Sequence, residues 1–232
     1  MTPSTLFITG TDTGVGKTIV TAALSIALAR PAEESGTPTS VAVDKPVQTG
    51  AATGEPMDTD VVHALAPSCA CSEGLRLQRP MAPVPAARLE GARLPSIHEQ
   101  AARIRSIAEG FDHLLIEGAG GALVQLDDGG STLVELAAAL GGPSSFVVVC
   151  RSGLGTLNHT ELTLEVLGHR GLHVAGVVIG SWPEDPDEID RSNRRHLSRL
   201  GVRLLGAIPA GASRLEPALF RQRAPTWFDA LP

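Results

Sequence analysis

The sequence has few of the features that mark membrane proteins and disulfide-rich proteins. No apolar run reaches the roughly 18–20 residues that a membrane-spanning helix needs. The first residues lack the basic start and long apolar centre of a signal peptide, so we expect a cytoplasmic protein. Cys69 and Cys71 stand too close together for an easy disulfide, and neither they nor Cys150 show C-x₂-C metal spacing. We therefore predict ordinary reduced thiols.

An excess of positive charge is also absent. The chain of 232 residues carries 19 Lys and Arg against 25 Asp and Glu, a net charge of −6. This balance argues against a general affinity for nucleic acid or for anionic membranes. With 43% hydrophobic residues, the chain is long enough for one sizeable core. We predict a single domain over residues 1–232, with small molecules or protein as partners.

The strongest positive signal is a glycine-rich loop at residues 10–18. The apolar run before it, residues 6–9, predicts a buried strand, and the spacing of apolar residues after Lys17 predicts a helix. A strand, a glycine loop and a helix N-terminus in this order are the setting of a phosphate-binding loop.

The residue types within the loop suit a triphosphate. Gly14 and Gly16 let the backbone turn its N–H groups inward. Lys17 adds a cation, and the hydroxyl of Thr18 can bind Mg²⁺. The usual spacing places a glycine where this chain has Thr11. The loop predicts binding of a nucleoside triphosphate and says little about the reaction.

A lysine follows the next predicted strand, residues 40–44. Taken alone, Lys45 would most often be a solvated loop residue. Ligands of open parallel sheets, however, bind at the carboxyl ends of the strands, and Pro46 restricts Lys45 to extended geometry. Lys45 can therefore place a second cation near the phosphates.

Two stretches offer carboxylates for a metal. Residues 57–65 predict a short helix with Asp58 or Asp60 in its first turn, either as a capping acid or as a Mg²⁺ ligand. Residues 111–117 predict a strand that ends in Glu117, the usual place of an acidic contact to Mg²⁺. The glycines that follow let the backbone approach the phosphates.

The remaining chain alternates between helices and strands. Five prolines in residues 67–95 predict an irregular connection that covers the site, with a substrate-side wall at Met81–Pro83. The other expected elements are a loop at 31–40, helices at 96–109, 132–140, 160–169 and 186–200, strands at 145–150, 173–179 and 202–208, and a helical tail. Capping boxes formed by Ser96 with Glu99 and by Thr132 with Glu135 predict the starts of the first two of these helices. Thr156 and Asn158 are candidate caps of the helix at 160–169, or alternatively the N-terminus of this helix is offered to a substrate carboxylate. Arginines four apart in the helix at 186–200 lie among acids and predict a solvated face.

Almost every candidate site residue follows a strand. This order predicts an α/β fold with a doubly wound, mainly parallel sheet flanked by helices, a three-layer sandwich like that of P-loop NTPases. The site is expected at the carboxyl edge of the sheet.

Four blocks of sequence resemble the signature blocks of the dethiobiotin synthetase family, in the same order. They are Gly-Thr-Asp-Thr-Gly-Val-Gly-Lys-Thr at 10–18, Lys-Pro-Val-Gln-Thr-Gly at 45–50, Glu-Gly-Ala-Gly-Gly at 117–121 and Leu-Gly-Thr-Leu-Asn-His at 154–159. The resemblance extends over nearly the whole chain. The lysine block and the glutamate-glycine block after this variant phosphate loop make it specific.

The resemblance implies a homodimeric ligase that uses ATP and Mg²⁺. Enzymes of this family convert 7,8-diaminononanoate and CO₂ into dethiobiotin, with ADP and phosphate as products. One substrate amine captures CO₂ as a carbamate, the carbamate attacks the γ-phosphate, and the second amine closes the ring. Such a reaction needs no nucleophile from the protein, only positioning and charge compensation.

The resemblance also implies roles for individual residues. Lys17 and Lys45 would be catalytic cations that neutralise phosphate and carbamate oxygens. Thr49 would contact the amino or carbamate end of the substrate. Gly155 and Asn158 would receive the substrate carboxylate from the neighbouring subunit, which places the site at the dimer interface. The metal set would be Thr18, Asp60 and Glu117. The nucleotide-binding set would be Thr13, Gly14, Val15, Gly16, Lys17, Thr18, Asp60, Glu117, Gly118, Ala119, Gly120, Gly180, Ser181, Pro209 and Ala210.

One departure from the family concerns the nucleotide base. The family commonly carries Asn-Asp after the fifth strand, whereas this chain has Gly180-Ser181. The lost amide and carboxylate leave the base preference open, with ATP as the default. The main alternative function is a P-loop switch ATPase that partitions or delivers a protein partner. Such proteins carry a lysine early in the loop, where this chain has Asp12. Another small-molecule ligase or phosphotransferase on the same fold is a further alternative.

Overall fold

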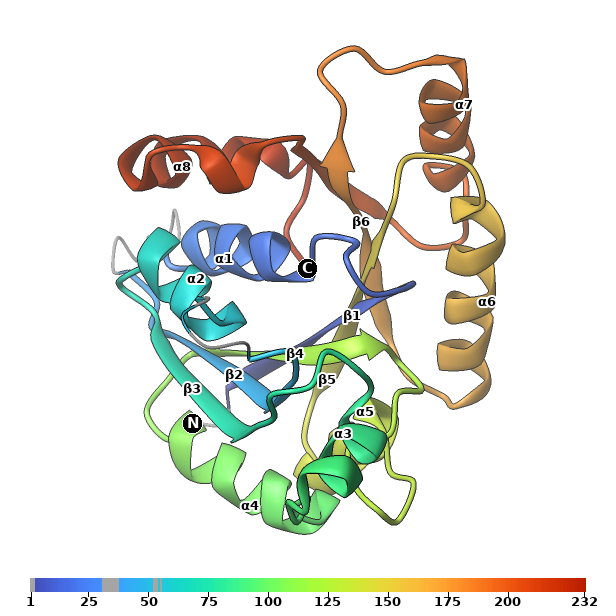
Figure 1. The fold of residues 1–232 in the computed structure, drawn as a ribbon. Coiled ribbons are helices and arrows are strands. Elements are labelled where there is room, and N and C mark those ends of the chain that lie inside the picture. The colour runs from blue at the N-terminus through green and yellow to red at the C-terminus, as the bar shows by residue number, and fades with distance from the viewer. Residues whose placement is uncertain (1–2, 31–37, 52–53, 55) are drawn as a thin grey trace.

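A parallel sheet forms the centre of the molecule in the computed structural model, which describes residues 3–30, 38–51, 54 and 56–232. The described residues contribute seven strands in the order β3-β2-β4-β1-β5-β6-β7 (Figure 1). Their bounds are β1 Ser4–Gly10, β2 Val41–Gln48, β3 Ala70–Arg76, β4 His113–Gly121, β5 Ser144–Cys150, β6 Val174–Trp182 and β7 Leu204–Pro209. The chain leaves β1 toward β2 and β3, then returns through β4 to β5. This reversal places β1 and its following loop at the switch point of the sheet, where ligands bind in doubly wound folds.

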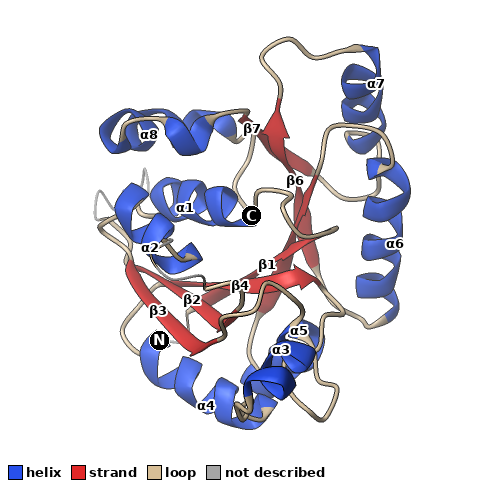
Figure 2. Cartoon of the chain, viewed as in Figure 1, coloured by secondary structure: helices blue, strands red, loops and turns tan. Residues whose placement is uncertain are grey.

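Helices cover both faces of the sheet, which gives three layers (Figure 2). One face carries α1 Lys17–Leu28, α2 Asp58–Leu65 and α8 Pro217–Arg223. The other carries α3 Pro83–Glu90, α4 Ile97–Ala108, α5 Leu133–Leu140, α6 Thr156–His169 and α7 Glu188–Leu197. The predicted α/β class and sandwich are confirmed. No helix in the described ranges is both long and apolar enough to cross a membrane.

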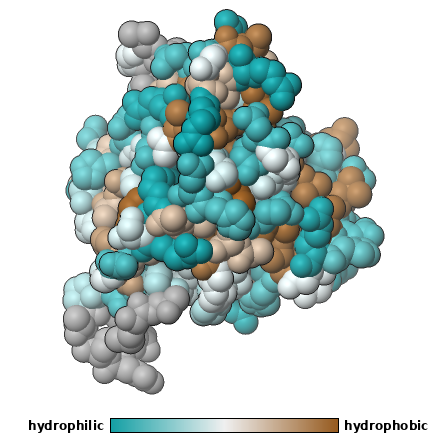
Figure 3. All heavy atoms as spheres, turned by 90° about the horizontal axis from the view of Figure 1, so that it is seen from below, coloured by the Kyte–Doolittle hydropathy of each residue, from teal (hydrophilic) through white to brown (hydrophobic). Residues whose placement is uncertain are grey.

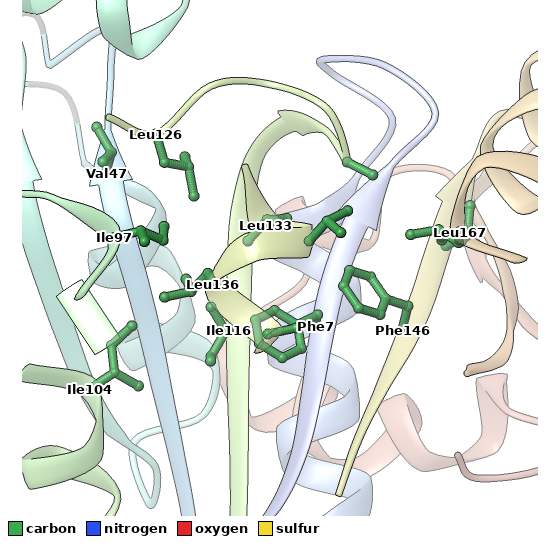
Figure 4. Close-up of a cluster of buried hydrophobic side chains, with 14 of the residues drawn as sticks. Phe7, Val47, Ile97, Ile104, Ile116, Leu126, Leu133, Leu136, Phe146 and Leu167 are labelled. Carbon is green, nitrogen blue, oxygen red and sulfur yellow. The ribbon is translucent and has the colours of Figure 1, made fainter. Parts of the chain in front are cut away.

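The larger of two apolar clusters lies between the sheet and helices α3 to α7. Phe7 of β1 and Phe146 of β5 are fully buried and stack with ring centroids 5.0 Å apart (Figure 4). Leu133 and Leu136 of α5 pack onto the same cluster. Because these strands are buried on both faces, they consist of nearly continuous apolar residues, as the sequence indicated.

Local signals set the helix starts correctly in several places. Ser96 and Glu99 form the predicted capping box at α4, and Thr132 and Glu135 form the predicted one at α5.

The outer side of α4 is polar. Seen from below Figure 1, the molecule is largely hydrophilic with scattered apolar groups (Figure 3). These helices therefore bury one stripe and expose the other, as amphipathic helices do.

The region 67–95 is more ordered than predicted. It contains the edge strand β3 and the helix α3, so the prediction of an irregular connection was wrong. The middle of β3 is half-exposed and includes Glu73 and Gly74, so its sequence lacks the apolar character of the inner strands. Pairing with β2 supplies what local propensity does not.

Two further boundaries differ from the predictions. Helix α6 begins at Thr156 and not at residue 160, and Gly155 occupies its N-cap without a side-chain cap, so the predicted capping by Thr156 and Asn158 was wrong. Strand β2 extends through Gln48 and so includes the first four residues of the lysine block. Residues 31–37 of the predicted loop lie outside the described residues. Cys69, Cys71 and Cys150 are free, as predicted.

Candidate active site

The phosphate loop leaves β1 and enters α1 through glycines in left-handed backbone conformations. Gly14 and Gly16 have φ angles of 72° and 98°, which other residues adopt only with strain. Gly16 is the N-cap of α1 and has no side chain that could satisfy the first N–H groups of the helix. Those groups remain available to an anion, and this is the local basis of phosphate binding.

The loop is also fixed from the side. A Cβ placed on Gly180, in β6, would lie 1.9 Å from the carbonyl oxygen of Val15. A Cβ on Gly16 would lie 2.6 Å from the carbonyl oxygen of Gly180. Only glycine at both positions permits this approach, so Gly180 acts by letting the loop pack on β6.

Lys17 is buried beneath the loop. Its Nζ donates to the carbonyl oxygen of Asp12 at 3.1 Å, and the carboxylate of Asp12 in turn accepts from Arg151. Burial lowers the pKa of the Lys17 ammonium, and the nearby positive charge of Lys45 lowers it further. Lys17 thus lies where the loop would surround a phosphate group.

Lys45 and Glu117 face each other where the pairing of β2 and β4 ends. The two strands pair as far as Asp44 and Ile116, and Lys45 and Glu117 are the next residues. Lys45 Nζ lies 2.9 Å from Glu117 Oε1, although 72 positions separate the residues in the chain. Both side chains are almost fully buried.

Asp58, at the start of α2, completes the cluster from above the sheet. Helices α1 and α2 lie side by side there (Figure 1). Asp58 Oδ2 lies 2.7 Å from Lys45 Nζ. Burial raises the pKa of Asp58, but attraction to Lys45 and hydrogen bonds from Lys45 and Thr18 lower it by more. Burial likewise lowers the pKa of Lys45, and the carboxylates of Glu117 and Asp58 raise it by more.

The structure places Asp58 beside Thr18 and Lys45, whereas Asp60, which the sequence assigned to the metal set, lies elsewhere. The Asp60 carboxylate accepts from the backbone N–H of Met57 at 2.9 Å, so Asp60 is the capping acid of α2 and is exposed. Asp58 points toward Thr18 and Lys45 instead. Two residues correspond to about 200° around a helix, so only one of these acids can face the site.

The arrangement of oxygens around Thr18 suits Mg²⁺. Thr18 Oγ1 lies 3.0 Å from Asp58 Oδ1 and 3.0 Å from Glu117 Oε1. A hydroxyl has one proton and can donate to only one of these carboxylates, so the three oxygens converge in a way that a hard cation would satisfy. Thr21 Oγ1 donates to the other oxygen, Glu117 Oε2, at 2.8 Å and orients that carboxylate.

This oxygen set is small, as is common for Mg²⁺. No group of three or more His, Cys, Asp or Glu that could hold a metal occurs in the part of the chain that the structure describes. Magnesium in nucleotide sites usually takes one or two carboxylates and completes its shell with phosphate and water. Two carboxylates and one hydroxyl therefore fit it.

A cavity of about 550 Å³ opens beside these groups, a size typical of small-molecule sites. Thr49 lines it, and so do Met81, Ala82 and Pro83, where the substrate-side wall was predicted. The predicted site residues that line it are Thr13, Gly14, Gly16, Lys17, Thr18, Lys45, Thr49, Glu117, Ala119 and Gly120. Gly118 contributes its carbonyl oxygen, which accepts from Lys45 at 3.1 Å.

The sequence interpretation missed Gln48 in this cavity. Its side chain is buried, Nε2 donates to the carbonyl oxygen of Thr49, and Oε1 has no hydrogen-bond partner among the residues that the structure describes. The adjoining sequence signal was the lysine block itself, of which only Lys45 and Thr49 were singled out.

A second hollow of about 400 Å³ lies on the other side of the phosphate loop. Val15, Ser181 and Ala210, all predicted to bind nucleotide, line it together with Gly14. Pro209 is the last residue of β7, directly before Ala210. The predicted residues thus surround the loop on both sides.

The predicted carboxylate-binding residues lie apart from both hollows. Gly155 and Asn158 are exposed at the start of α6 and line neither one. The preceding loop is fixed from behind, because Asn193 Nδ2 donates to the carbonyl oxygens of Ser152 and Gly153 at 2.7 and 3.0 Å.

The distribution of lysine is unusual. Only two of the 19 basic residues in the sequence are lysines, and both are in this site. Every other Lys or Arg position holds arginine, whose planar guanidinium is larger than the compact ammonium of lysine.

Comparisons with known proteins agree with the geometry. A family model described as an AAA domain matches residues 4–216. The ATP-dependent dethiobiotin synthetase BioD of Rhodococcus jostii is 48% identical over 228 residues, covering 98% of this chain and 95% of that protein. The enzyme of the same name from Frankia casuarinae is 49% identical over 211 residues, covering 90% of this chain and 85% of that protein.

Solved structures with low sequence identity share the fold. The cell division ATPase MinD of Pyrococcus furiosus aligns with a TM-score of 0.57 and 20% identity, covering 95% of this chain and 89% of that chain. A ParA family ATPase from Chlorobium tepidum aligns with a TM-score of 0.56 and 14% identity, covering 97% of this chain and 91% of that chain.

Proposed function

The chain belongs to the family of ATP-dependent dethiobiotin synthetases, and on this premise we propose how its residues divide the work of the reaction. It is a ligase that forms C–N bonds in biotin biosynthesis and uses ATP. The observation that supports the proposal best is that two buried lysines and two carboxylates converge beside one cavity. This set can compensate charge around a phosphoryl group and a carbamate without supplying a nucleophile.

The phosphate loop binds the triphosphate. Backbone N–H groups at the start of α1 face the phosphates, and Lys17 neutralises their oxygens from below. The base would lie in the second hollow, near Ser181 and Ala210. ATP is the default nucleotide. Neither residue offers a side-chain amide to the base, so other triphosphates can also serve as substrates.

Thr18, Asp58 and Glu117 would hold Mg²⁺. When bound, the ion would neutralise negative charge on the phosphate oxygens. Thr21 keeps the Glu117 carboxylate turned toward Thr18 through its hydrogen bond.

The diamine and CO₂ occupy the cavity between Lys45 and the wall at Met81–Pro83. A neutral substrate amine attacks CO₂, and Lys45 balances the negative charge of the resulting carbamate. The carbamate oxygen attacks the γ-phosphorus with ADP as the leaving group, and the second amine then attacks the carbamate carbon, which closes the ring and expels phosphate. Thr49 and Gln48 orient the amines. The buried Oε1 of Gln48 can accept a hydrogen bond from an N–H group, which an unpaired buried acceptor requires.

The carboxylate end of the substrate is assigned to Gly155 and Asn158 of a second subunit. Their exposure supports this role, because an exposed helix start can serve a neighbouring molecule. The protein would then act as a cytoplasmic homodimer. Sedimentation of the protein as a dimer would support the assignment. A raised KM for the diamine in an Asn158→Ala variant would support it as well.

The direct experiment measures products. Purified protein with Mg-ATP, 7,8-diaminononanoate and bicarbonate is expected to release phosphate and form dethiobiotin in equal amounts. Each substrate is omitted in turn as a control. Hydrolysis that ignores the diamine but responds to a protein or to DNA would favour the switch ATPase and would contradict the proposal.

A further inference from the structure

Three oxygens surround the Lys45 ammonium, two through hydrogen bonds and one through an ion pair. Nζ contacts Asp58 Oδ2 at 2.7 Å, Glu117 Oε1 at 2.9 Å and the carbonyl oxygen of Gly118 at 3.1 Å. An ammonium has three donors, and the side chain is only 5% exposed. In this arrangement these three contacts occupy the ammonium, and a phosphate or carbamate oxygen would have to displace one of them.

We propose that Lys45 is an internal competitor of the metal: it holds the two carboxylates together before Mg²⁺ binds, and metal binding releases it toward the substrate. The inference rests on the proposed function, because it takes Thr18, Asp58 and Glu117 as the metal ligands. It adds an order of events, in which the metal must arrive with the nucleotide before Lys45 can serve the carbamate.

The competition follows from shared oxygens. Glu117 Oε1 contacts both Lys45 Nζ and Thr18 Oγ1, at 2.9 and 3.0 Å. A magnesium ion bound to Thr18 and Glu117 would take the electron pairs of the same oxygen and repel the ammonium. The two cations therefore cannot both keep their full contacts with this carboxylate pair.

Lys45 also explains how the carboxylates of Asp58 and Glu117 can lie close together when no metal is bound. Two carboxylates that share a buried site repel each other, and the pKa of one of them then rises. Lys45 offsets one of the two negative charges and bonds to both groups. Removal of one partner from a buried charge cluster of this kind destabilises the protein, because it leaves a charge uncompensated.

Asp58 is the partner that Lys45 would give up. Its side chain is 32% exposed, whereas that of Glu117 is 2% exposed. Thr21 also binds the second oxygen of Glu117 and fixes it from behind. Asp58 stands at the first position of the eight-residue helix α2 and has more freedom to turn toward a metal.

Lys17 differs in a way that provides a control. The partner of its Nζ is the carbonyl oxygen of Asp12, so it does not bond to the carboxylate pair. Nucleotide phosphates alone should therefore engage Lys17, whereas Lys45 should respond only when the metal is present.

The chain allows a clean test because it contains only two lysines. Full-length protein with ¹³C,¹⁵N-labelled lysine gives two lysine spin systems, assigned with Lys17→Met and Lys45→Met. A non-hydrolysable ATP analogue is added in EDTA, and excess Mg²⁺ follows. The analogue alone is expected to shift Lys17, and Mg²⁺ is expected to shift Lys45 afterwards.

Two results would overturn the inference. One is a Lys45 signal that moves to its final position with the metal-free analogue, and the other is a Lys45 signal that Mg²⁺ leaves unchanged although Lys17 reports bound nucleotide. If neither lysine responds to the analogue at any concentration, the proposed function itself fails and the inference falls with it.

A metal titration without nucleotide gives an independent readout. Binding of Mn²⁺, as a paramagnetic substitute for Mg²⁺, is measured by EPR for the parent protein, Lys45→Met and Lys17→Met, after thermal unfolding has shown that each variant is folded. Lys45→Met is expected to bind Mn²⁺ at least about tenfold more tightly than the parent, because a competing cation in direct contact is removed. Lys17→Met should gain less affinity for Mn²⁺ than Lys45→Met does. Equal gains would indicate a general charge effect and would contradict the proposal, as would unchanged or weaker binding in Lys45→Met.

Discussion

The carbonyl oxygen of Val15 and the α-carbon of Gly180 are in direct contact across the phosphate loop. A Cβ on Gly180 would lie 1.9 Å from that oxygen, closer than any real contact allows. The family position that commonly carries asparagine is thus sterically closed in this chain. The departure noted in the sequence has a structural cause and is not merely a missing base contact.

Gly180→Asn is therefore expected to weaken nucleotide binding and not to restore base recognition. The side chain would displace the loop, and overpacking of this kind costs about 1–3 kcal/mol. Titration with ATP should show at least about tenfold weaker binding. Gly201→Ala is the matched control, because nothing lies within 4 Å of a Cβ there. A Gly180→Asn variant that binds ATP more tightly and rejects other triphosphates would contradict this view.

Lys45→Ala is expected to reduce turnover much more than nucleotide affinity. Lys45 lies on the carbamate side of the cavity, and loss of one preorganised charge commonly costs about 10²–10³ in kcat. Steady-state rates and a nucleotide titration on the same variant separate the two effects. An equal loss in kcat and in affinity would reassign Lys45 to simple nucleotide binding.

Asp58 and Asp60 form a matched pair for the metal assignment. Asp58→Asn should raise the Mg²⁺ concentration for half-maximal rate by roughly 10- to 100-fold, since it removes a charged ligand. Asp60→Asn should change it little, because an asparagine oxygen can still accept from the N–H of Met57. The opposite ranking in a Mg²⁺ titration would restore the original interpretation of Asp60.

The buried ion pair next to the site should matter for stability. Arg103 donates to both oxygens of Asp44 at 2.7 and 2.8 Å, and Asp44 is fully buried in β2, directly before Lys45. Arg103→Leu leaves this carboxylate without its charged partner and should lower the free energy of unfolding by about 2–4 kcal/mol.

The exposed pair of Arg93 and Glu99 provides the comparison. Both side chains are at least half exposed, so water already solvates the two charges and Arg93→Leu should lower the free energy of unfolding far less than Arg103→Leu. Urea unfolding at neutral pH measures both variants. Similar small losses in the two would show that the existing hydrogen bond from Ser72 is enough to hold the Asp44 carboxylate.

The sequence by itself determined the features that depend on neighbouring residues. The glycine loop, the capping boxes at Ser96 and Thr132 and the apolar inner strands were predicted correctly because each rests on interactions within a few positions. Their order along the chain then defined the parallel sheet and placed the site at its carboxyl edge. The family followed from four short blocks and is confirmed by full-length relatives.

The structure decided what depends on partners far apart in the chain. β3 is a strand because β2 pairs with it, although its own residues are weak strand formers. Asp58 and not Asp60 faces the site because the packing of α2 against α1 fixes the orientation of α2 about its own axis. The sequence of the helix, with two acids in one turn, does not reveal that orientation. The three oxygen contacts of Lys45 also depend on the tertiary structure, which brings residues of β2, α2 and β4 together. Composition and spacing identify the residues that can carry charge. The tertiary structure determines which of these charged groups contact the same oxygen.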